Sequence, residues 1–351
     1  MPQLFVGNFT FEEELSGHRQ HLPEGLRRLE AELAPCWAAV AGENDLIWCP
    51  SPPDQPLASP AQTVSRESDI PHGLELVPWG WTDRIRSWGC SVRATVSAPS
   101  PEAVLTANSR CFTRELESRW DCGLDFSTVV SSMSELSQRL DEIDERTDWV
   151  IRTDHSGAAR NRLLGTGPDL TPSQLGWLSK RFSRKGRLIW EPWVERLEEA
   201  SLHWTIPPET APRFDGITGL LTDHLGRYLG SSFGNAAPSI EEWSEALDVG
   251  GRLALELQQL GYFGPLGVDA LRYRNAEGNL RVRPLQDVNA RWTMGRLSLG
   301  WSRRFESGMW RHGTGEEMND AQRRGSLLLK TSPDRIGDAI VNHRTWIEAA
   351  D

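Results

Sequence analysis

Three polar side chains alternate along residues 280–296, LRVRPLQDVNARWTMGR. Asp287, Asn289 and Arg291 stand at every second position, so in a β-strand they would project from one face. The residues between them are apolar and suit a packed opposite face. The simplest explanation is an edge strand with a polar, solvent-exposed face. The alternative is a ligand site, and the preceding strand helps to distinguish the two.

The preceding segment supplies a second carboxylate. GPLGVDALRYRNAEGNLRVRPLQDVNAR predicts a hairpin that turns at NAEGN, with Asp269 on its first strand. Pairing through this turn can bring Asp269, Asp287 and the carboxamide of Asn289 together. Oxygen ligands of this kind hold Mg²⁺, which keeps several waters and takes further ligands from substrate phosphates. Arg291, one step farther along the same face, could bind those phosphates in a bidentate manner.

The composition limits what such a site could serve. The chain has 351 residues, of which 38% are hydrophobic and 25% charged, as in a globular protein of one large or two smaller domains. Its net charge of -11 and the lack of a basic stripe argue against a nucleic-acid partner. No run of about 18 apolar residues and no leader segment is found, so we expect no membrane span and a cytoplasmic location. The five cysteines are widely spaced and contain no CxxC pair, which predicts reduced structural thiols.

Strand and helix patterns alternate along the chain. QLFVG, EGLRRLEAELA and DLIWC predict a strand, an amphipathic helix and a second strand, the usual start of an α/β domain. After residue 120 the predicted strands and helices are longer, and the sequence contains no internal repeat. We therefore predict an α/β domain over residues 1–120, a second domain over 121–300 and a helical tail over 301–351 that packs on the core.

The hairpin resembles the metal-binding end of the ATP-grasp superfamily. In that family an acidic residue lies on one strand, and an acidic residue, a spacer and Asn lie on the next; Asp269, Asp287 and Asn289 match this pattern. WVIRTDHSGAARNRLLG is similar to the strand and Gly-containing loop that cover the nucleotide phosphates. LIWEPWVERLEEASLHWTI is similar to the segment that joins the two lobes and meets the adenine. The resemblance implies an α/β (α+β) fold, with an N-terminal pre-ATP-grasp α/β domain followed by a two-lobed ATP-grasp domain.

The resemblance also implies ATP and Mg²⁺ as cofactors and assigns roles to residues. The metal ligands would be Asp269, Asp287 and Asn289, and the catalytic residues would be Arg152 and Arg291. The implied cofactor-binding residues are Arg152, Ser156, Gly157, Arg160, Glu191, Trp193 and Glu199.

Two arginine positions are further candidates for the site. The family places lysines on the strand before the loop, where this chain has Arg152, and just before the adenine segment, where Lys185 and Arg187 stand. Lysine is rare, since of 38 basic residues only three are lysines. Arg110, in the sequence NSR, could line the cleft between the domains.

The activity that the resemblance implies is an ATP-dependent ligase that joins a carboxylate to an amine through an acyl phosphate. Its partners would be small-molecule substrates such as amino acids or peptides, and the loop at 156–160 would close over the phosphates to exclude water. A second hypothesis is a nucleotide-binding regulatory or partner-binding module without chemistry. It is motivated by Arg152 in place of lysine and by Asp287 in place of the usual Glu. A phosphotransferase on the same fold is the third.

Overall fold

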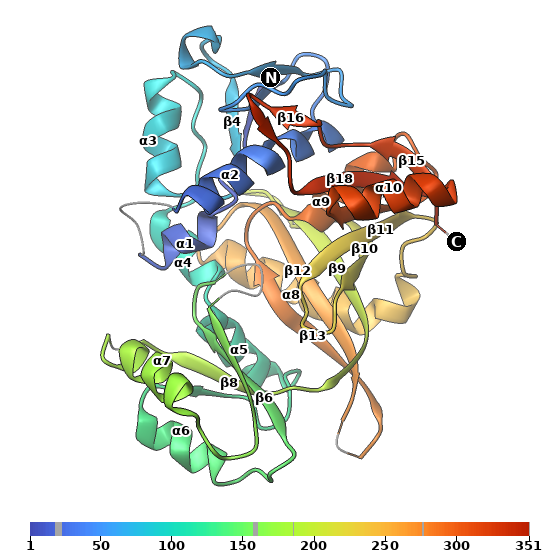
Figure 1. Ribbon diagram of the computed structural model, residues 1–351. Coiled ribbons are helices and arrows are strands. Elements are labelled where there is room, and N and C mark those ends of the chain that lie inside the picture. Colours follow the sequence, from blue (N-terminus) through green and yellow to red (C-terminus); the bar gives the residue numbers. More distant parts are fainter. Residues whose placement is uncertain (18–22, 157–160, 185, 276, 351) are drawn as a thin grey trace.

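The computed structural model of the chain describes residues 1–17, 23–156, 161–184, 186–275 and 277–350. Two four-stranded sheets, one eight-stranded sheet and one two-stranded ribbon organise these residues. Figure 1 shows the N-terminal domain in blue and cyan at the top, a small lobe in green at the bottom, and the large sheet between them. None of the described helices combines the length and apolar character that a membrane span needs.

The N-terminal domain is built on a parallel sheet with the strand order β3-β2-β1-β4. Its central strand β1 is buried on both faces, which explains its unbroken apolar sequence. Leu4 and Val6 pack with Ile85 on one face, whereas Phe5 contacts Trp37 on the other, with ring centroids 4.9 Å apart. The elements are β1 (Gln3–Val6), α1 (Phe11–Leu15), α2 (Glu24–Leu33), η1 (Ala34–Ala39), β2 (Leu46–Trp48), β3 (Gln62–Val64), η2 (Glu67–Asp69), β4 (Glu75–Pro78), α3 (Asp83–Ser91), α4 (Pro101–Ala107) and α5 (Arg110–Trp120).

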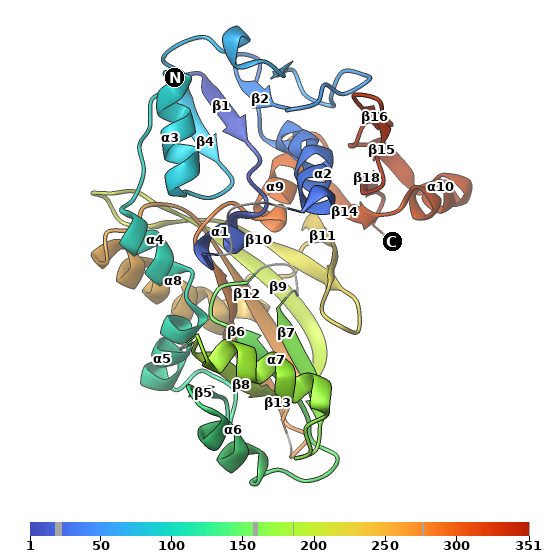
Figure 2. The same cartoon turned by 60° about the vertical axis from the view of Figure 1, so that its left-hand side comes forward.

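The small lobe is an antiparallel sheet with the order β5-β8-β6-β7, covered on one face by two helices. Figure 2 shows these helices, α6 and α7, outside the sheet. Trp149 and Trp190 are fully buried between strands and helices and form much of the lobe's core. The elements are β5 (Thr128–Val130), α6 (Met133–Leu140), β6 (Asp148–Thr153), β7 (Arg162–Thr166), α7 (Pro172–Phe182) and β8 (Leu188–Pro192).

The large sheet has the order β13-β12-β9-β10-β11-β14-β18-β15, and all of its pairs are antiparallel. Helix α8 packs on β9, β12 and β13, and Gly250 allows a close approach, because a Cβ there would lie 2.2 Å from the ring of Trp204. The elements are β9 (Glu195–Ile206), β10 (Arg213–Thr222), β11 (Tyr228–Gly234), η3 (Glu241–Trp243), α8 (Ser244–Gln259), β12 (Gly264–Arg274), β13 (Leu280–Asn289), α9 (Met294–Trp301), β14 (Ser307–Gly313), α10 (Gly315–Arg324), β15 (Leu327–Lys330), β16 (Arg335–Ile336), β17 (Ala339–Ile340) and β18 (Arg344–Glu348).

The predicted hairpin is present as β12 and β13. Its register places Asp269 directly opposite Asp287, and Gly267 opposite Asn289. Since alternate residues of a strand share a face, Asp287 and Asn289 lie on the same side of the sheet. Strand β9 continues this face, because Ser201 is the register partner of Asp269 on the other side of β12.

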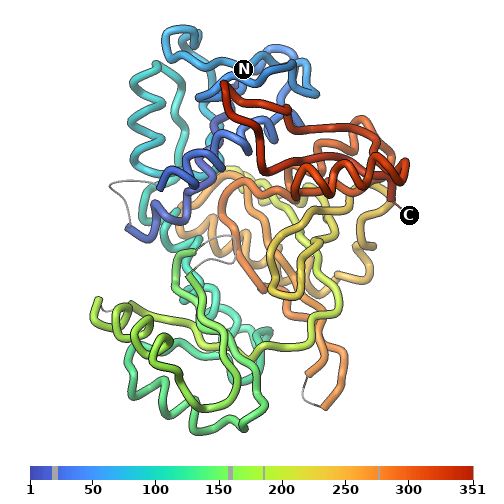
Figure 3. The backbone as a smooth tube through the Cα atoms, in the orientation of Figure 1, coloured from blue at the N-terminus to red at the C-terminus, as the bar shows by residue number. Residues whose placement is uncertain are grey.

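The prediction of a helical tail over residues 301–351 is wrong. Three strands, β14, β18 and β15, add to the edge of the large sheet, and α10 packs on them. Strand β14 alternates buried and partly exposed residues, with Trp310 and His312 inward and Arg311 between them. This period of two is easily overlooked because the inward face includes a histidine. Figure 3 traces this red segment back over the blue N-terminal domain, where Arg28 donates a hydrogen bond to the carbonyl of Ile340.

Candidate active-site cleft

A cleft of about 400 Å³ opens on one face of the large sheet. It is bordered by strands β9 to β14 of that sheet, by the small lobe and by the N-terminal domain. Six guanidinium groups and four carboxylates of the described residues line it, an excess of positive charge in a chain of net charge -11. Such a cleft attracts anions. The charged lining residues are Glu12, Arg110, Arg152, Arg162, Arg196, Glu199, Arg227, Asp269, Asp287 and Arg291.

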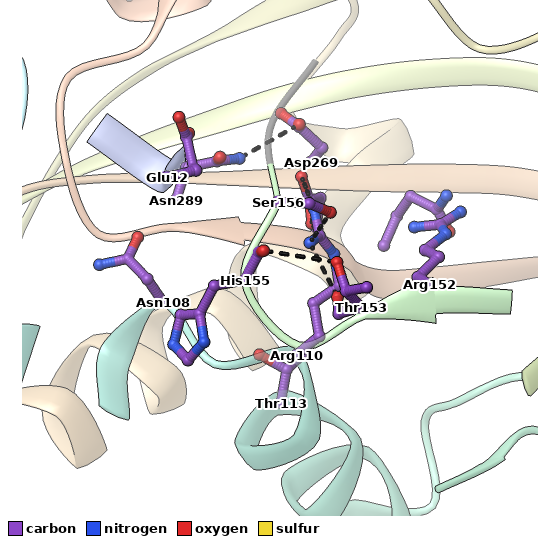
Figure 4. A network of polar contacts seen from close by, with 12 residues as sticks. Glu12, Asn108, Arg110, Thr113, Arg152, Thr153, His155, Ser156, Asp269 and Asn289 are labelled. Atoms are coloured by element: carbon purple, nitrogen blue, oxygen red, sulfur yellow. Dashed lines mark hydrogen bonds and ion pairs between the residues drawn. The ribbon is translucent and has the colours of Figure 1, made fainter. Parts of the chain in front are cut away.

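Asp269 and Asp287 form an acidic pair on the floor of this cleft. Ser201 donates a hydrogen bond of 2.6 Å to Asp269 Oδ1, and Asn289 Nδ2 donates one of 3.4 Å to Asp269 Oδ2 (Figure 4). Burial and the neighbouring Asp287 raise the pKa of Asp269 to about 7. Two carboxylates held side by side disfavour their joint ionisation unless a cation lies near them. The expected convergence of Asp269, Asp287 and Asn289 is therefore observed, and their role as metal ligands stays a prediction.

The donor set of this acidic pair fits Mg²⁺ better than a softer ion. Within the described ranges, no group of three or more histidine, cysteine, aspartate or glutamate side chains is arranged to hold a metal ion. Two carboxylates and a carboxamide would therefore need water and phosphate oxygens to complete a shell. This is the usual manner in which Mg²⁺ binds beside a nucleotide.

Arg110, the first residue of α5, connects the acidic pair to the small lobe. Its Nε donates to Asp287 Oδ1 over 3.2 Å, and its Nη1 donates to Ser156 Oγ over 2.9 Å. Ser109 fixes this helix start, since its hydroxyl accepts a hydrogen bond from the backbone of α5 and donates to Asp154 Oδ1. Figure 4 shows Arg110 reaching from the helix toward Ser156. The suggestion that this arginine lines the interdomain cleft is confirmed.

Neither basic residue expected just before the adenine segment is found in the cleft among the described residues. Arg187 instead pairs with Glu115 at 3.3 Å and does not line the cleft, while Lys185 lies outside the described residues. A weak signal for Arg110 is present in the sequence: a serine suited to an N-cap stands directly before an arginine, in a chain that has few lysines.

Arg152 reaches the cleft from strand β6 of the small lobe. Its side chain lines the cleft together with Asp287, as the ligase hypothesis requires, and its Nε lies 3.4 Å from Glu191 Oε2. In a module without chemistry, Arg152 would be expected to pair with a neighbouring carboxylate such as Asp154 or Glu191 and to point away from the acidic pair. The pairing is present, whereas the orientation is toward the cleft.

The segment around Glu191 and Trp193 joins β8 of the small lobe to β9 of the large sheet, as predicted. The apolar adenine slot expected beside it is not observed among the described residues. Arg283 of β13 enters this space and donates to both Glu117, over 2.6 Å, and Glu191. Burial favours a higher pKa for Glu191, but Arg283 and Arg152 lower this pKa to about 2. These charged groups leave a cavity of only about 10 Å³, which also has Gln286 in its wall.

Trp193 does not line the cleft in which the charged residues gather. It borders that small cavity and also an open groove of about 920 Å³, shared with Glu195 and Trp243. The groove is larger than the cleft but contains neither the acidic pair nor Arg152, so we place the chemistry in the cleft.

Arg291 lies at the boundary between the large sheet and the N-terminal domain. Its Nε donates to Glu12 Oε1 over 2.6 Å, and its guanidinium carbon lies 5.3 Å from the ring centroid of Trp79. The N-cap of α9, Thr293, follows two residues later and also lines the cleft. The guanidinium is thus held in place two residues beyond Asn289, next to the end of β13.

The remaining implied cofactor-binding residues are divided between the cleft and the part that is not described. Ser156 and Glu199 line the cleft, and Glu199 accepts hydrogen bonds from Arg196 and Thr222. Gly157 and Arg160 lie outside the described residues. The nucleotide-binding role of all these residues stays a prediction.

The chain is similar to known proteins in its structure, whereas its sequence matches none of those compared. No family model matches the chain, and the search of curated proteins gives no match. N5-carboxyaminoimidazole synthetase from Staphylococcus aureus, complexed with ADP, matches with a TM-score of 0.55 at 8% identity, covering 99% of this chain and 92% of that one. The biotin carboxylase domain of Hydrogenobacter thermophilus 2-oxoglutarate carboxylase, with MgADP, ADP and bicarbonate, gives 0.54 at 10% identity, covering 99% and 86%.

A third similar structure carries the superfamily's name. It is a protein from Archaeoglobus fulgidus described as belonging to the ATP-grasp superfamily, with a TM-score of 0.51 at 11% identity and 100% coverage of both chains. At these identities the likeness establishes the fold. The chain therefore has the ATP-grasp fold that its hairpin residues predicted.

Proposed function

We propose that this protein is an ATP- and Mg²⁺-dependent ligase that joins a carboxylate to an amine through an acyl phosphate. The observation that carries the proposal is the cleft, where Asp269 and Asp287 lie side by side beneath arginines from both flanking parts. Structures of the same fold hold ADP, and one holds MgADP and bicarbonate, which supports a nucleotide and a small carboxylate or related acid as ligands. We expect small-molecule substrates such as amino acids or peptides, and a cytoplasmic location.

The reaction requires a carboxylate oxygen to attack the γ-phosphorus in line, and charge on the transferring group to be neutralised. Mg²⁺ would be held by Asp269, Asp287 and Asn289, and when bound it would neutralise part of this negative charge. Arg110 of α5 and Arg152 of the small lobe both line the cleft and can bind phosphate oxygens. The amine then attacks the acyl carbon, and phosphate leaves with the electron pair of the carbon–oxygen bond.

Arg291 is the residue best placed to orient the carboxylate substrate. Its ion pair with Glu12 and its contact with Trp79 restrict the side chain before any ligand binds. A guanidinium fixed in this way can hold a carboxylate or a phosphate through two parallel hydrogen bonds. Preorganised positive charge of this kind is most effective where negative charge develops in the transition state.

Release of ADP and phosphate tests the ligase directly. The full-length chain would be incubated with Mg·ATP and with pairs drawn from a panel of carboxylates and amines. The proposal predicts release that depends on both members of a pair and yields an amide. Release without an acceptor, or a phosphorylated product in place of an amide, would instead identify a hydrolase or a phosphotransferase.

One observation favours the second hypothesis, a nucleotide-binding regulatory or partner-binding module. Arg283 and its carboxylate partners fill the space beside Glu191, and Arg110 is already paired with Asp287. A protein without chemistry could retain both arrangements. Tight binding of ATP with no ADP release across the whole panel would select this hypothesis.

Arg152→Ala should weaken ATP binding by roughly 1.5 to 3 kcal/mol, the range for a hydrogen bond to a charged group. The reason is that Arg152 lines the cleft beside Asp287, whereas Glu191 keeps Arg283 as a partner in the variant. Calorimetric titration with Mg·ATP measures the change. Arg187→Ala, a surface arginine of the same lobe, is the matched control and should bind as the wild type does. Equal affinities of the two variants would remove Arg152 from the phosphate site.

A further inference from the structure

The cleft continues beyond the acidic pair along the same face of the large sheet, toward strand β14. Its lining passes from β12 and β13 across β9, β10 and β11 to His312 of β14. The N-terminal domain lines one wall of the cleft with the apolar side chains of Phe9, Leu29, Leu33 and Trp79. The rings of Phe9 and Trp79 are 4.7 Å apart, and Trp79 also contacts Arg291 at the near end.

Two histidines close the far end. His312 Nδ1 and His343 Nε2 are 3.1 Å apart and share one hydrogen bond, and the ring of Tyr228 packs against His312. Burial lowers the pKa of His312 well below its ordinary value, and His343 adds to this effect. Burial also lowers the pKa of His343, although Glu32 opposes it. Both rings are therefore uncharged near neutral pH.

His312 keeps one polar atom without a partner. Its Nε2 is buried and has no hydrogen-bond partner among the described residues. If His312 donates to His343, this nitrogen is an acceptor, and if His343 donates, it carries a proton and is a donor. Burying either form without a partner costs free energy. A ligand that supplies a hydroxyl or an amide could satisfy both forms.

The charges of this part of the cleft argue against a phosphorylated substrate. Arg291, at the near end, is positioned to hold one anionic group. Arg227, which precedes Tyr228 in the chain, pairs with Asp223 at 2.6 Å, and Arg291 likewise pairs with Glu12. Arg291 differs in following Asp287 and Asn289 at alternate positions, which places it beside the acidic pair. A substrate with a second anion at its far end would face neutral histidines and apolar side chains.

We propose that the carboxylate substrate is an acid with an apolar, aromatic or branched body and an uncharged hydrogen-bonding group at its far end. This inference rests on the proposed ligase function. The carboxylate lies at Arg291, the body packs against Phe9, Leu29 and Leu33, and the far group meets His312. Pockets that combine an apolar lining with a few convergent polar groups obtain orientation and specificity in this manner. The site thus differs in substrate from the related structures that hold bicarbonate or an aminoimidazole ribonucleotide.

Four defined probes test this substrate class in the presence of Mg²⁺ and a non-hydrolysable ATP analogue. They are 3-(4-hydroxyphenyl)propionate, 3-phenylpropionate, propionate and ribose 5-phosphate. We expect the phenyl group to improve the dissociation constant at least about tenfold over propionate, the hydroxyl to improve it further, and ribose 5-phosphate not to bind. Calorimetric titration gives the four constants.

Variants separate a specific pocket from general adsorption. Leu29→Glu places a charge in the apolar wall and should abolish the preference for the phenyl acids, whereas Leu26→Glu, on the same helix but outside the lining, should keep it. His312→Phe should remove the preference for the hydroxylated acid while the phenyl preference remains.

A thermal shift with Mg·ATP alone distinguishes a wrong substrate class from a wrong proposed function. If Mg·ATP raises the melting temperature but the four probes bind equally or not at all, the substrate class is wrong and the ligase proposal stands. If ribose 5-phosphate binds best, the site takes a phosphorylated substrate and the inference is overturned. If Mg·ATP gives no shift, the proposed function fails and this inference fails with it.

Discussion

Asp287→Asn should reduce Mg²⁺-dependent turnover of ATP by roughly 100-fold or more, because a metal ion contributes several kcal/mol of transition-state stabilisation. Asp287 faces Asp269 across the hairpin, and the two are the carboxylates of the acidic pair. Asp269→Asn should have an effect of similar size. Glu277→Gln, in the exposed turn of the same hairpin, is the matched control and should keep full activity.

The Asp269→Asn variant has a second, opposite effect, which is on stability. The pKa of Asp269 is raised to about 7 by burial and by Asp287, so the folded state binds this proton more tightly than the unfolded state does. Its contribution to stability is therefore complete below about pH 4 and is lost as the pH rises through about 7. Without Mg²⁺, the difference in free energy of unfolding between Asp269→Asn and the wild type should therefore favour the variant more at pH 8 than at pH 5.

Turnover and unfolding measured on the same preparations check both effects. A variant that loses stability at pH 8 and keeps its turnover would contradict the assignment of Asp269 and Asp287 to a cation site. Addition of Mg²⁺ and ATP should stabilise the wild type and not the variants, since a ligand that binds only the folded state shifts unfolding by mass action.

Arg283→Met should reduce the free energy of unfolding by about 3 to 5 kcal/mol, the usual cost of leaving buried charges unpaired. Arg283 is almost completely buried and pairs with both Glu117 and Glu191, so its removal leaves two carboxylates close together. Chemical denaturation measures the loss. Arg274→Met, on the partner strand of the same hairpin, removes an exposed pair with Glu195 and should cost less than about 1 kcal/mol.

The double variant Arg283→Met, Glu117→Gln refines this prediction. It should recover part of the lost stability, because the two carboxylates no longer lie close together and Glu191 keeps Arg152 as its partner. A cost for Arg283→Met as small as that for Arg274→Met would mean that solvent reaches this network. The space beside Glu191 would then be open enough to reconsider as an adenine slot.

The hairpin and its acidic pair could be predicted because their information is local. Alternation along β13 fixes the face, and the short turn fixes the register that places Asp269 opposite Asp287. The strand–helix–strand start of the N-terminal domain is equally local, and β1, α2 and β2 appear where they were expected.

The pairings that could not be predicted join residues that are far apart in the chain. Arg110 meets Asp287 across 177 positions, and Arg283 meets Glu117 across 166. No pattern of spacing indicates such pairs, because only the packing of α5 on β13 brings them together. The filled space beside Glu191 could not be predicted for the same reason.

The C-terminal strands illustrate a different difficulty. Strand β14 has Trp310 and His312 on its inner face, and a buried histidine does not look apolar in a sequence. Its partner β18 is separated from it by α10, β15, β16 and β17, so no hairpin turn marks the pair. A sequence that is polar by composition therefore suggested helices where the sheet continues.

Calorimetric titration of ATP into the full-length chain, with and without Mg²⁺, tests the central claim most directly. The account predicts one ATP per chain, an affinity that Mg²⁺ increases, and the loss of this increase in Asp287→Asn. Absence of ATP binding under both conditions, or binding that depends on neither Mg²⁺ nor Asp287, would contradict the assignment of the cleft as a Mg·ATP site.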